Sequence, residues 1–191
     1  MKNHIKISSS IKPFNEQIEV SGDKSISIRC VLIASQAIGK SRIYNLLESE
    51  DVISALNSIK KLGIKFKKKN NYYEIYGYGI NGYKTNKNIT INAGNSGTLA
   101  RLILGLLINS KKKIKIIGDK SLSKRDFSRV TEPLKLFGAK TISYKKSLPV
   151  EITGSEFLRP IKYVEKLGSA QCKSSVTVSY THLTLPTSPK V

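Results

Sequence analysis

Four segments of the sequence combine cationic, hydroxyl or amide side chains with small residues, which is the chemistry needed to hold phosphate and carboxylate groups. The first is the segment 21–29 (SGDKSISIR), in which Lys24 and Ser25 open a predicted helix and Arg29 follows Ser25 by one helical turn. A helix N-terminus presents unpaired N–H groups and partial positive charge, so it attracts anions. The segment therefore indicates an anion-binding turn, although a simple helix cap with a solvated lysine explains the same residues.

The second segment, 92–101 (NAGNSGTLAR), is a small-residue loop between a predicted strand and an apolar helix. Gly94 and Gly97 allow a ligand to approach the backbone closely, and Asn95 supplies hydrogen-bond donors. Arg101 follows Gly97 by one helical turn. An ordinary strand-to-helix loop capped by serine or threonine is the alternative interpretation.

The third and fourth segments also lie at predicted helix starts. Residues 118–129 (GDKSLSKRDFSR) place Lys124, Arg125 and Arg129 where cations oppose the helix dipole, an arrangement that an anion between them would stabilise. A solvated basic turn remains the alternative. In residues 168–175 (GSAQCKSS), Ser169 and Gln171 could reach hydroxyl groups or a phosphate.

A fifth segment, Ala34–Ser41, matches a relaxed phosphate-binding loop pattern. We reject it, because a true loop of that kind follows a strand and opens a helix. This segment ends a predicted helix and opens a predicted strand.

The charge of the chain has three explanations. It carries 33 lysines and arginines against 13 acidic residues, a net charge of +20. Nucleic-acid binding, an anionic small substrate and a general bias towards lysine would each produce it. Only six of the basic residues are arginines, and four of those lie in the segments above. Because arginine forks carboxylates and phosphates, this placement favours anion recognition.

An internal repeat organises the elements that position these segments. Residues 51–66 and 126–141 match in pattern 75 positions apart, and in each copy a glycine follows the aspartate by 12 residues. Each unit is predicted as helix, strand, helix, strand, strand, and the second opens with an additional strand. The expected helices are 25–38, 50–62, 96–109 and 126–137, with Gly39, Gly63 and Gly138 as stops; the expected strands are 41–46, 72–77, 88–92, 114–117, 141–144 and 149–152.

A third unit begins near Tyr163, and its helix is expected to break off after about Val176. Residues 180–191 contain two prolines and no helical period, and we predict a non-native tail there. Residues 21–179 are predicted to form the substrate-binding domain, and residues 1–20 to lead in from a second domain.

Composition limits the class of protein. The sequence has no run of 18 apolar residues, no signal-like start, and two cysteines, Cys30 and Cys172, that form no metal-ligand spacing. We expect a reduced cytoplasmic protein with no membrane partner and no bound metal.

At these segments the sequence resembles the enolpyruvyl transferase family, and within it the branch that acts on shikimate 3-phosphate. The matching strings are GDKSISIR, GNSGTLAR, GDKSLSKR, RVTEPLKLFGA and GSAQCKS, in family order over about residues 5–176. The sister branch that acts on UDP-N-acetylglucosamine lacks the paired DKS and GNSGT strings.

The resemblance implies an α/β fold, an inside-out α/β barrel domain built of βαβαββ-like repeats. It implies transfer of the enolpyruvyl group of phosphoenolpyruvate to the 5-hydroxyl of shikimate 3-phosphate, with release of phosphate. The step belongs to chorismate and aromatic amino acid biosynthesis. No cofactor is implied, and the full-length protein is expected to be a monomer.

The resemblance also implies roles for individual residues. Lys24 would contact both substrates and take part in catalysis. The shikimate 3-phosphate site would consist of Lys24, Ser25, Arg29, Ser169 and Gln171; the phosphoenolpyruvate site would consist of Lys24, Asn95, Gly97, Arg125 and Gln171.

Two departures from the family pattern matter. Asp126 stands where the family usually has proline, which predicts a looser loop. The chain also spans less than half the family length, and the family's acid–base carboxylates lie in the other half, so we expect this chain alone to be inactive. A basic nucleic-acid-binding module is the alternative function, but no motif pairs its aromatic and basic residues, so no nucleic-acid partner is expected.

Overall fold

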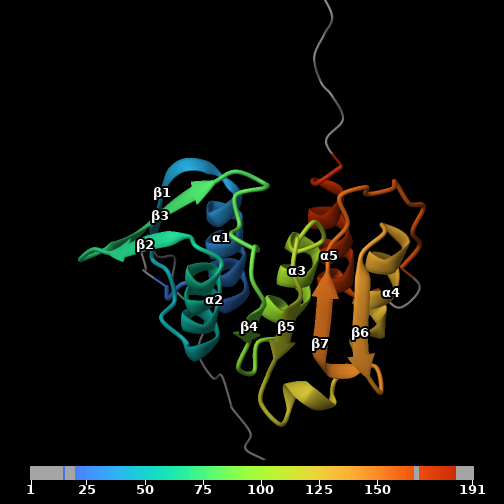
Figure 1. The fold of residues 1–191 in the computed structure, drawn as a ribbon. Helices are drawn as coiled ribbons and strands as arrows, with labels where there is room; N and C mark the ends of the chain where they lie inside the picture. The colour runs from blue at the N-terminus through green and yellow to red at the C-terminus, as the bar shows by residue number, and fades with distance from the viewer. Residues whose placement is uncertain (1–14, 16–19, 166–167, 184–191) are drawn as a thin grey trace, which may run out of the picture.

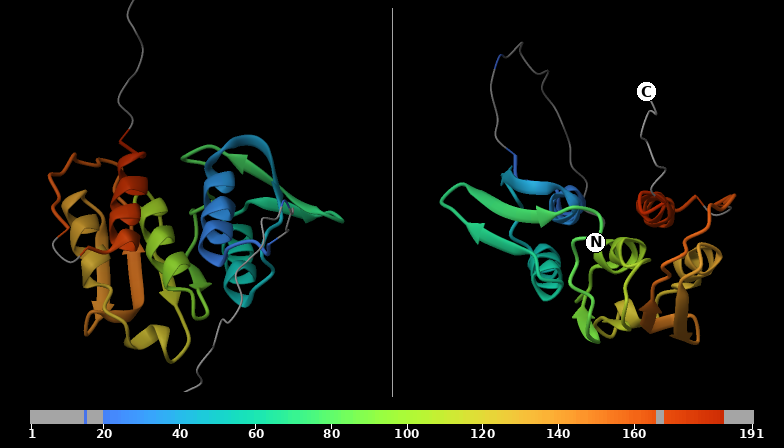
Figure 2. Two further views of the ribbon diagram at one scale, coloured as in Figure 1. Left: turned by 180° about the vertical axis from the view of Figure 1, so that it is seen from behind. Right: turned by 45° about the horizontal axis from the view of Figure 1, so that its top comes forward.

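The protein folds as helices on the inside and two β-sheets on the outside. The computed structural model describes residue 15 and residues 20–165 and 168–183. Seen nearly end-on, the helices lie side by side with the sheets around them (Figure 2). One sheet has the strand order β1-β3-β2 and is antiparallel, and the other has the order β4-β5-β7-β6, in which only β4 and β5 are parallel.

The predicted repeat is confirmed by the topology of the two sheets. The first unit contains α1 (Lys24–Gln36), β1 (Ile38–Tyr44), α2 (Glu50–Lys61), β2 (Lys65–Lys68) and β3 (Tyr72–Tyr78). The second contains β4 (Ile89–Asn92), α3 (Gly97–Leu106), β5 (Ile114–Ile117), the 3₁₀ turn η1 (Leu122–Lys124), α4 (Ser128–Leu136), β6 (Lys140–Tyr144) and β7 (Ser147–Thr153). The third begins with α5 (Ala170–Tyr180). The order β1-β3-β2 corresponds strand for strand to β5-β7-β6.

Two of the three predicted glycine stops are confirmed, and the third is wrong. Gly63 and Gly138 follow their helices at φ +89° and +111°, a region that glycine enters without strain. Gly39, however, lies inside β1, because α1 already ends at Gln36 with Ala37 as its cap. The chain turns early to pair Ile38 with Tyr78 of β3, a long-range contact that local sequence does not encode.

The third helix is longer than predicted. The expected break after Val176 is wrong, since α5 continues to Tyr180, whose ring packs edge-on against Phe137 at 6.2 Å. Of the proposed tail, residues 184–191 lie outside the described residues. The same holds for 1–14 and 16–19 of the predicted lead-in segment.

Helix α3 is the centre of the core. Nine of its ten residues are buried, so it presents no polar face to water. The rings of Phe127 and Phe137 are fully buried at the two ends of α4. The other four helices all contact α3, and the first sheet packs against α1 and α2. Helices α1, α3 and α5 run in one direction, with their N-terminal ends towards the lower edge of Figure 1.

Candidate anion-binding site

Helices α3 and α5 approach closely because the contact between them is made of small residues. Ser175 and Ser179 of α5 are fully buried, and their hydroxyls donate to the carbonyl oxygens of Arg101 (2.8 Å) and Gly105 (3.2 Å). Gly105 has no side chain to hold the helices apart. This contact brings the first turn of α5 beside the first turn of α3.

Gly97, Arg101 and Gln171 meet at this junction. Arg101 Nη1 donates to Gln171 Oε1 at 2.7 Å and to the Gly97 carbonyl oxygen at 3.5 Å, while Gln171 Nε2 donates to Thr98 Oγ1 at 3.0 Å. The Arg101 guanidinium also lies 5.0 Å from the centroid of the Phe127 ring. Gln171 is therefore held in place by two side chains that lie 70 or more positions earlier.

Arg125 extends over the same glycine from the loop after η1. A Cβ atom on Gly97 would lie 2.7 Å from Arg101 Nη1 and 3.0 Å from Arg125 Nη1, so both guanidinium groups occupy space that only glycine leaves free. Arg125 is exposed, and its Nη2 makes a long hydrogen bond of 3.4 Å to Asn95 Oδ1. Asn95 donates in turn to Asp119, whose other oxygen accepts from the Leu122 N–H at 2.7 Å.

The electrostatics of this cluster favour an anion. Burial lowers the pKa of Arg101, and the positive charges of Arg125 and Arg129 lower it further. Arg129 is partly neutralised, because its Nη2 donates to the buried Glu165 carboxylate at 3.0 Å. Arg125 therefore has most of its N–H donors exposed to solvent. It lies beside Arg101, whose charged form is disfavoured by the neighbouring positive charges. An anion bound between the two arginines would relieve this repulsion.

The side chain of Asp126 forms hydrogen bonds within its own loop. Its carboxylate accepts from the Ser128 N–H at 2.7 Å and from the Ser128 hydroxyl at 2.6 Å, which fixes the start of α4. Its carbonyl oxygen accepts from Arg101 at 3.4 Å. The sequence predicted a looser loop at this position; in the structure the Asp126 side chain makes two hydrogen bonds to Ser128 within that loop.

The N-terminal end of α1 carries the second group of predicted residues. Asp23 caps the helix by accepting from the Ile26 N–H at 2.7 Å, and Lys24 forms an ion pair of 3.0 Å with Asp51 of α2. Ser25 and Arg29 are half-buried on the same helix. Among the described residues, no hydrogen bond or ion pair joins this group to the Gly97 cluster, although both lie at the same end of the parallel helices (Figure 1).

Ser169 is the cap of α5, where its hydroxyl accepts from the Cys172 N–H at 3.3 Å. The structure thus brings together Asn95, Gly97, Arg125 and Gln171 and leaves Lys24, Ser25 and Arg29 as a separate group. Arg101 was counted among the arginines that favour anion recognition but was assigned to neither substrate site. The signal was available, because Arg101 follows Gly97 by one turn and must lie over it.

The site is an open face of the domain. A hollow between Ile80, Asn109 and Phe157 includes none of the eight candidate residues and lies near the C-terminal end of α3.

None of the described helices has the length and apolar character needed to cross a bilayer.

The fold and the site define an α/β domain that gathers cationic and amide side chains at the N-termini of parallel helices. Comparison with known proteins narrows this class. The profile of the family described as EPSP synthase (3-phosphoshikimate 1-carboxyvinyltransferase) matches residues 9–181. The chain belongs to this family, and its domain is of the family's inside-out α/β barrel type.

Individual relatives agree. The chain is 38% identical over 177 residues to the 3-phosphoshikimate 1-carboxyvinyltransferases of two Streptococcus pyogenes strains, of serotypes M49 and M4; the match covers 92% of this chain and 41% of each relative. A solved EPSP synthase from Acinetobacter baumannii is 36% identical with a TM-score of 0.79, over 85% of this chain and 37% of that one. The chain therefore spans about two fifths of the length of the relatives it matches.

Proposed function

We propose that this chain carries one half of the active site of an enzyme that transfers the enolpyruvyl group of phosphoenolpyruvate to the 5-hydroxyl of shikimate 3-phosphate, releasing phosphate. The observation that carries the proposal is the cluster in which Arg101, Arg125 and Gln171 meet over Gly97. Family membership supports the identity of the substrates. We further propose that the enzyme is cytoplasmic, works as a monomer and needs no cofactor.

The two groups of residues suggest how the substrates divide the site. Asn95, Gly97, Arg125 and Gln171 would hold phosphoenolpyruvate. Ser25, Arg29, Ser169 and Gln171 would hold shikimate 3-phosphate, with Lys24 between the two. Gln171 belongs to both sets, which fits its place at the junction of α3 and α5.

The chemistry of the reaction suits this arrangement. Both substrates are multiply anionic, and fixing them together removes much of the entropic barrier to their reaction. Charged donors placed in advance also stabilise the tetrahedral intermediate of an addition–elimination reaction. The Lys24 side chain is 55% exposed although its partner Asp51 is only 15% exposed, so its ammonium group is free to turn from Asp51 towards a substrate.

Calorimetric titration of the purified chain with shikimate 3-phosphate is the direct test. We expect saturable binding that inorganic phosphate at equal ionic strength does not reproduce. Arg29→Ala should weaken it about tenfold or more, because a charge-assisted hydrogen bond contributes about 1.5–3 kcal/mol. Arg159→Ala, at an exposed arginine in the segment after β7, is the matched control and should bind normally. Equal, weak responses to both ligands from a folded chain would contradict the proposal.

We also expect the 191-residue chain to bind without turning over. Proton transfer to the enol carbon and from the hydroxyl needs an acid and a base, and closure over an open site needs a second domain. In an assay of phosphate release from phosphoenolpyruvate and shikimate 3-phosphate, the rate with the chain should equal the rate without protein. Release above that rate, abolished by Lys24→Ala, would show that this domain suffices.

A further inference from the structure

The outer face of the sheet β1-β3-β2 combines tyrosines with cations and takes no part in the site above. Along β3, Tyr73 and Ile75 point towards the helices and are buried, so the alternate residues point outward. We call this surface the outer sheet face; it consists of Lys40, Arg42 and Tyr44 on β1, Tyr72, Glu74, Tyr76 and Tyr78 on β3, and Lys65 and Lys67 on β2.

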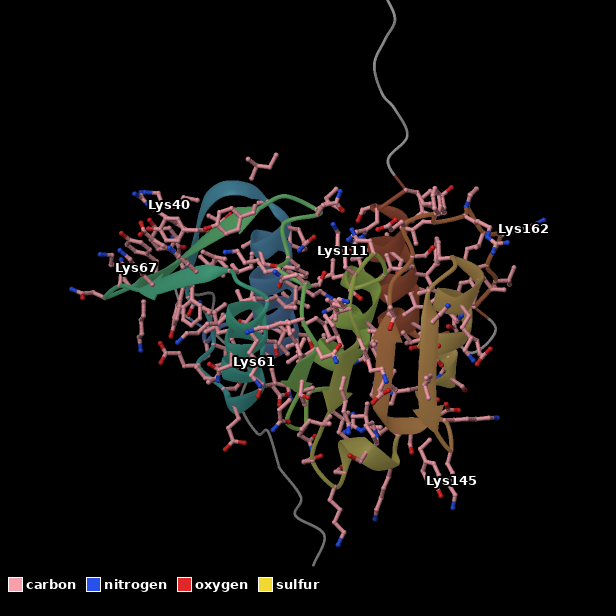
Figure 3. All side chains as sticks on the ribbon, viewed as in Figure 1. Lys40, Lys61, Lys67, Lys111, Lys145 and Lys162 are labelled. Carbon is pink, nitrogen blue, oxygen red and sulfur yellow. The ribbon has the colours of Figure 1, made fainter. Side chains whose placement is uncertain are left out.

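Strand register arranges these side chains in rows. Tyr76 of the central strand lies opposite Lys40 on one side and Lys65 on the other. In the next row, Glu74 lies between Arg42 and Lys67. Each of these two rows of cations thus has a tyrosine in an adjacent row, two residues away along the strand. Figure 3 shows Lys40 and Lys67 extending from this sheet at the outer edge of the molecule.

The tyrosines form a surface that can be stacked upon. Tyr44 and Tyr78 are 58% and 53% exposed, and Tyr72 and Tyr76 are half-buried. The rings of Tyr44 and Tyr72 lie 5.2 Å apart, and the Arg42 guanidinium lies 5.6 Å from the centroid of Tyr72. The rings are therefore supported by their neighbours, which reduces the loss of conformational freedom on binding.

Glu74 holds the central part of this face in place. Its carboxylate accepts from the Tyr76 hydroxyl at 2.9 Å and from Arg42 Nε at 3.4 Å, and Lys40 Nζ lies 3.7 Å away. The carboxylate is almost fully covered by these groups. The face carries four cations and one shielded carboxylate, so it keeps a net positive charge.

We propose that the outer sheet face binds single-stranded nucleic acid. Cations arranged along a groove or sheet attract the phosphate backbone, and aromatic rings between them stack on unpaired bases of any sequence. A small anion would not need four tyrosines, and duplex DNA hides the faces of its bases. The tyrosines at 72, 76 and 78 alternate along one strand, but the cations of this face come from the two neighbouring strands and join them only through strand pairing. The proposal differs from the sequence-based expectation of no nucleic-acid partner.

Fluorescence anisotropy with a labelled 12-nucleotide oligo(dT) and the full 191-residue chain tests the proposal. We expect saturable binding, with log K falling against log salt at a slope between about −2 and −3, since about four phosphates are neutralised at about 0.7 each. The corresponding oligo(U) should bind similarly, and a duplex of equal length should bind at least about tenfold more weakly. Saturating shikimate 3-phosphate should not compete.

Variants separate stacking from charge. Tyr72→Ala with Tyr76→Ala should weaken binding about tenfold or more, and Tyr72→Phe with Tyr76→Phe should restore it because phenylalanine retains the ring. Lys65→Ala with Lys67→Ala should reduce the steepness of the salt slope by about 1.4. The matched control is Lys140→Ala with Tyr144→Ala on the exposed side of β6, which should bind like the unchanged chain.

Three outcomes would overturn the proposal. One is equal affinity for the single strand, the duplex and poly-glutamate competitors, which would leave only general charge or a protein partner. Another is unchanged affinity in a tyrosine-to-alanine variant that keeps its melting temperature. If that variant does not fold, an unchanged salt slope in the lysine variant decides against the proposal instead.

Discussion

Replacing Arg125 with alanine is expected to weaken the binding of phosphoenolpyruvate strongly while leaving the fold unchanged. Arg125 is exposed and makes one long hydrogen bond, so the domain loses little without it. A bound anion, in contrast, would lose a forked, charge-assisted contact beside Gly97, which contributes about 1.5–3 kcal/mol, or roughly 10–100-fold in affinity. Titrating phosphoenolpyruvate in the presence of shikimate 3-phosphate, with detection at the amide NMR signals of Asn95 and Gly97, measures this loss.

Lys124→Ala is the control for Arg125→Ala. Lys124 precedes Arg125 and is also exposed, and its replacement by alanine removes the same charge. Because salt screens a charge that does not contact the ligand, Lys124→Ala should reduce the affinity for phosphoenolpyruvate by less than about twofold at physiological salt. Equal losses in the two variants would show that the loop attracts anions only through its net charge. Arg125→Lys should fall between, because lysine cannot fork a carboxylate.

Much of this site could be predicted from sequence because its parts are local. Glycines, capping residues and apolar periodicity within about ten residues predict where the helices start. They also predict the loops that carry Asn95, Arg125 and Ser169. The internal repeat then implies that corresponding helix ends lie on the same side. These features depend on short-range physical chemistry, which a single sequence contains.

Features that depend on long-range packing could not be predicted. The end of α1 depends on the pairing of Ile38 with Tyr78, and Gly77 allows the carbonyl oxygens at the end of α1 to approach β3. The contact of Arg101 with Gln171 joins residues 70 positions apart through the α3–α5 packing. The outer sheet face depends in the same way on strand register, which places the cations of β1 and β2 beside the tyrosines of β3.

Two glycines in α3 should respond in opposite ways to alanine. At Gly105 a Cβ atom would lie 2.4 Å from the Ser175 carbonyl oxygen and 2.8 Å from Val178 Cγ2. The first of these is backbone, so α5 itself must move. We expect Gly105→Ala to lower the free energy of unfolding by about 2 kcal/mol, the cost of overpacking a core contact less the gain in helix propensity. Because α5 carries Ser169 and Gln171, binding of shikimate 3-phosphate should weaken as well.

At Gly97, in contrast, the added methyl group crowds the ends of the Arg101 and Arg125 side chains, which can move, and lies at an ordinary contact distance of 3.8 Å from Gln171 Oε1. Gly97→Ala should keep or raise the stability by up to about 1 kcal/mol, since alanine favours the helix. It should nevertheless weaken phosphoenolpyruvate binding, because both guanidinium groups are displaced, and it should affect shikimate 3-phosphate binding less. Urea unfolding and calorimetry on the two variants measure both quantities. A loss of stability at Gly97 equal to that at Gly105 would mean that this glycine serves packing, and the assignment of the phosphoenolpyruvate site to the surface above it would then fail.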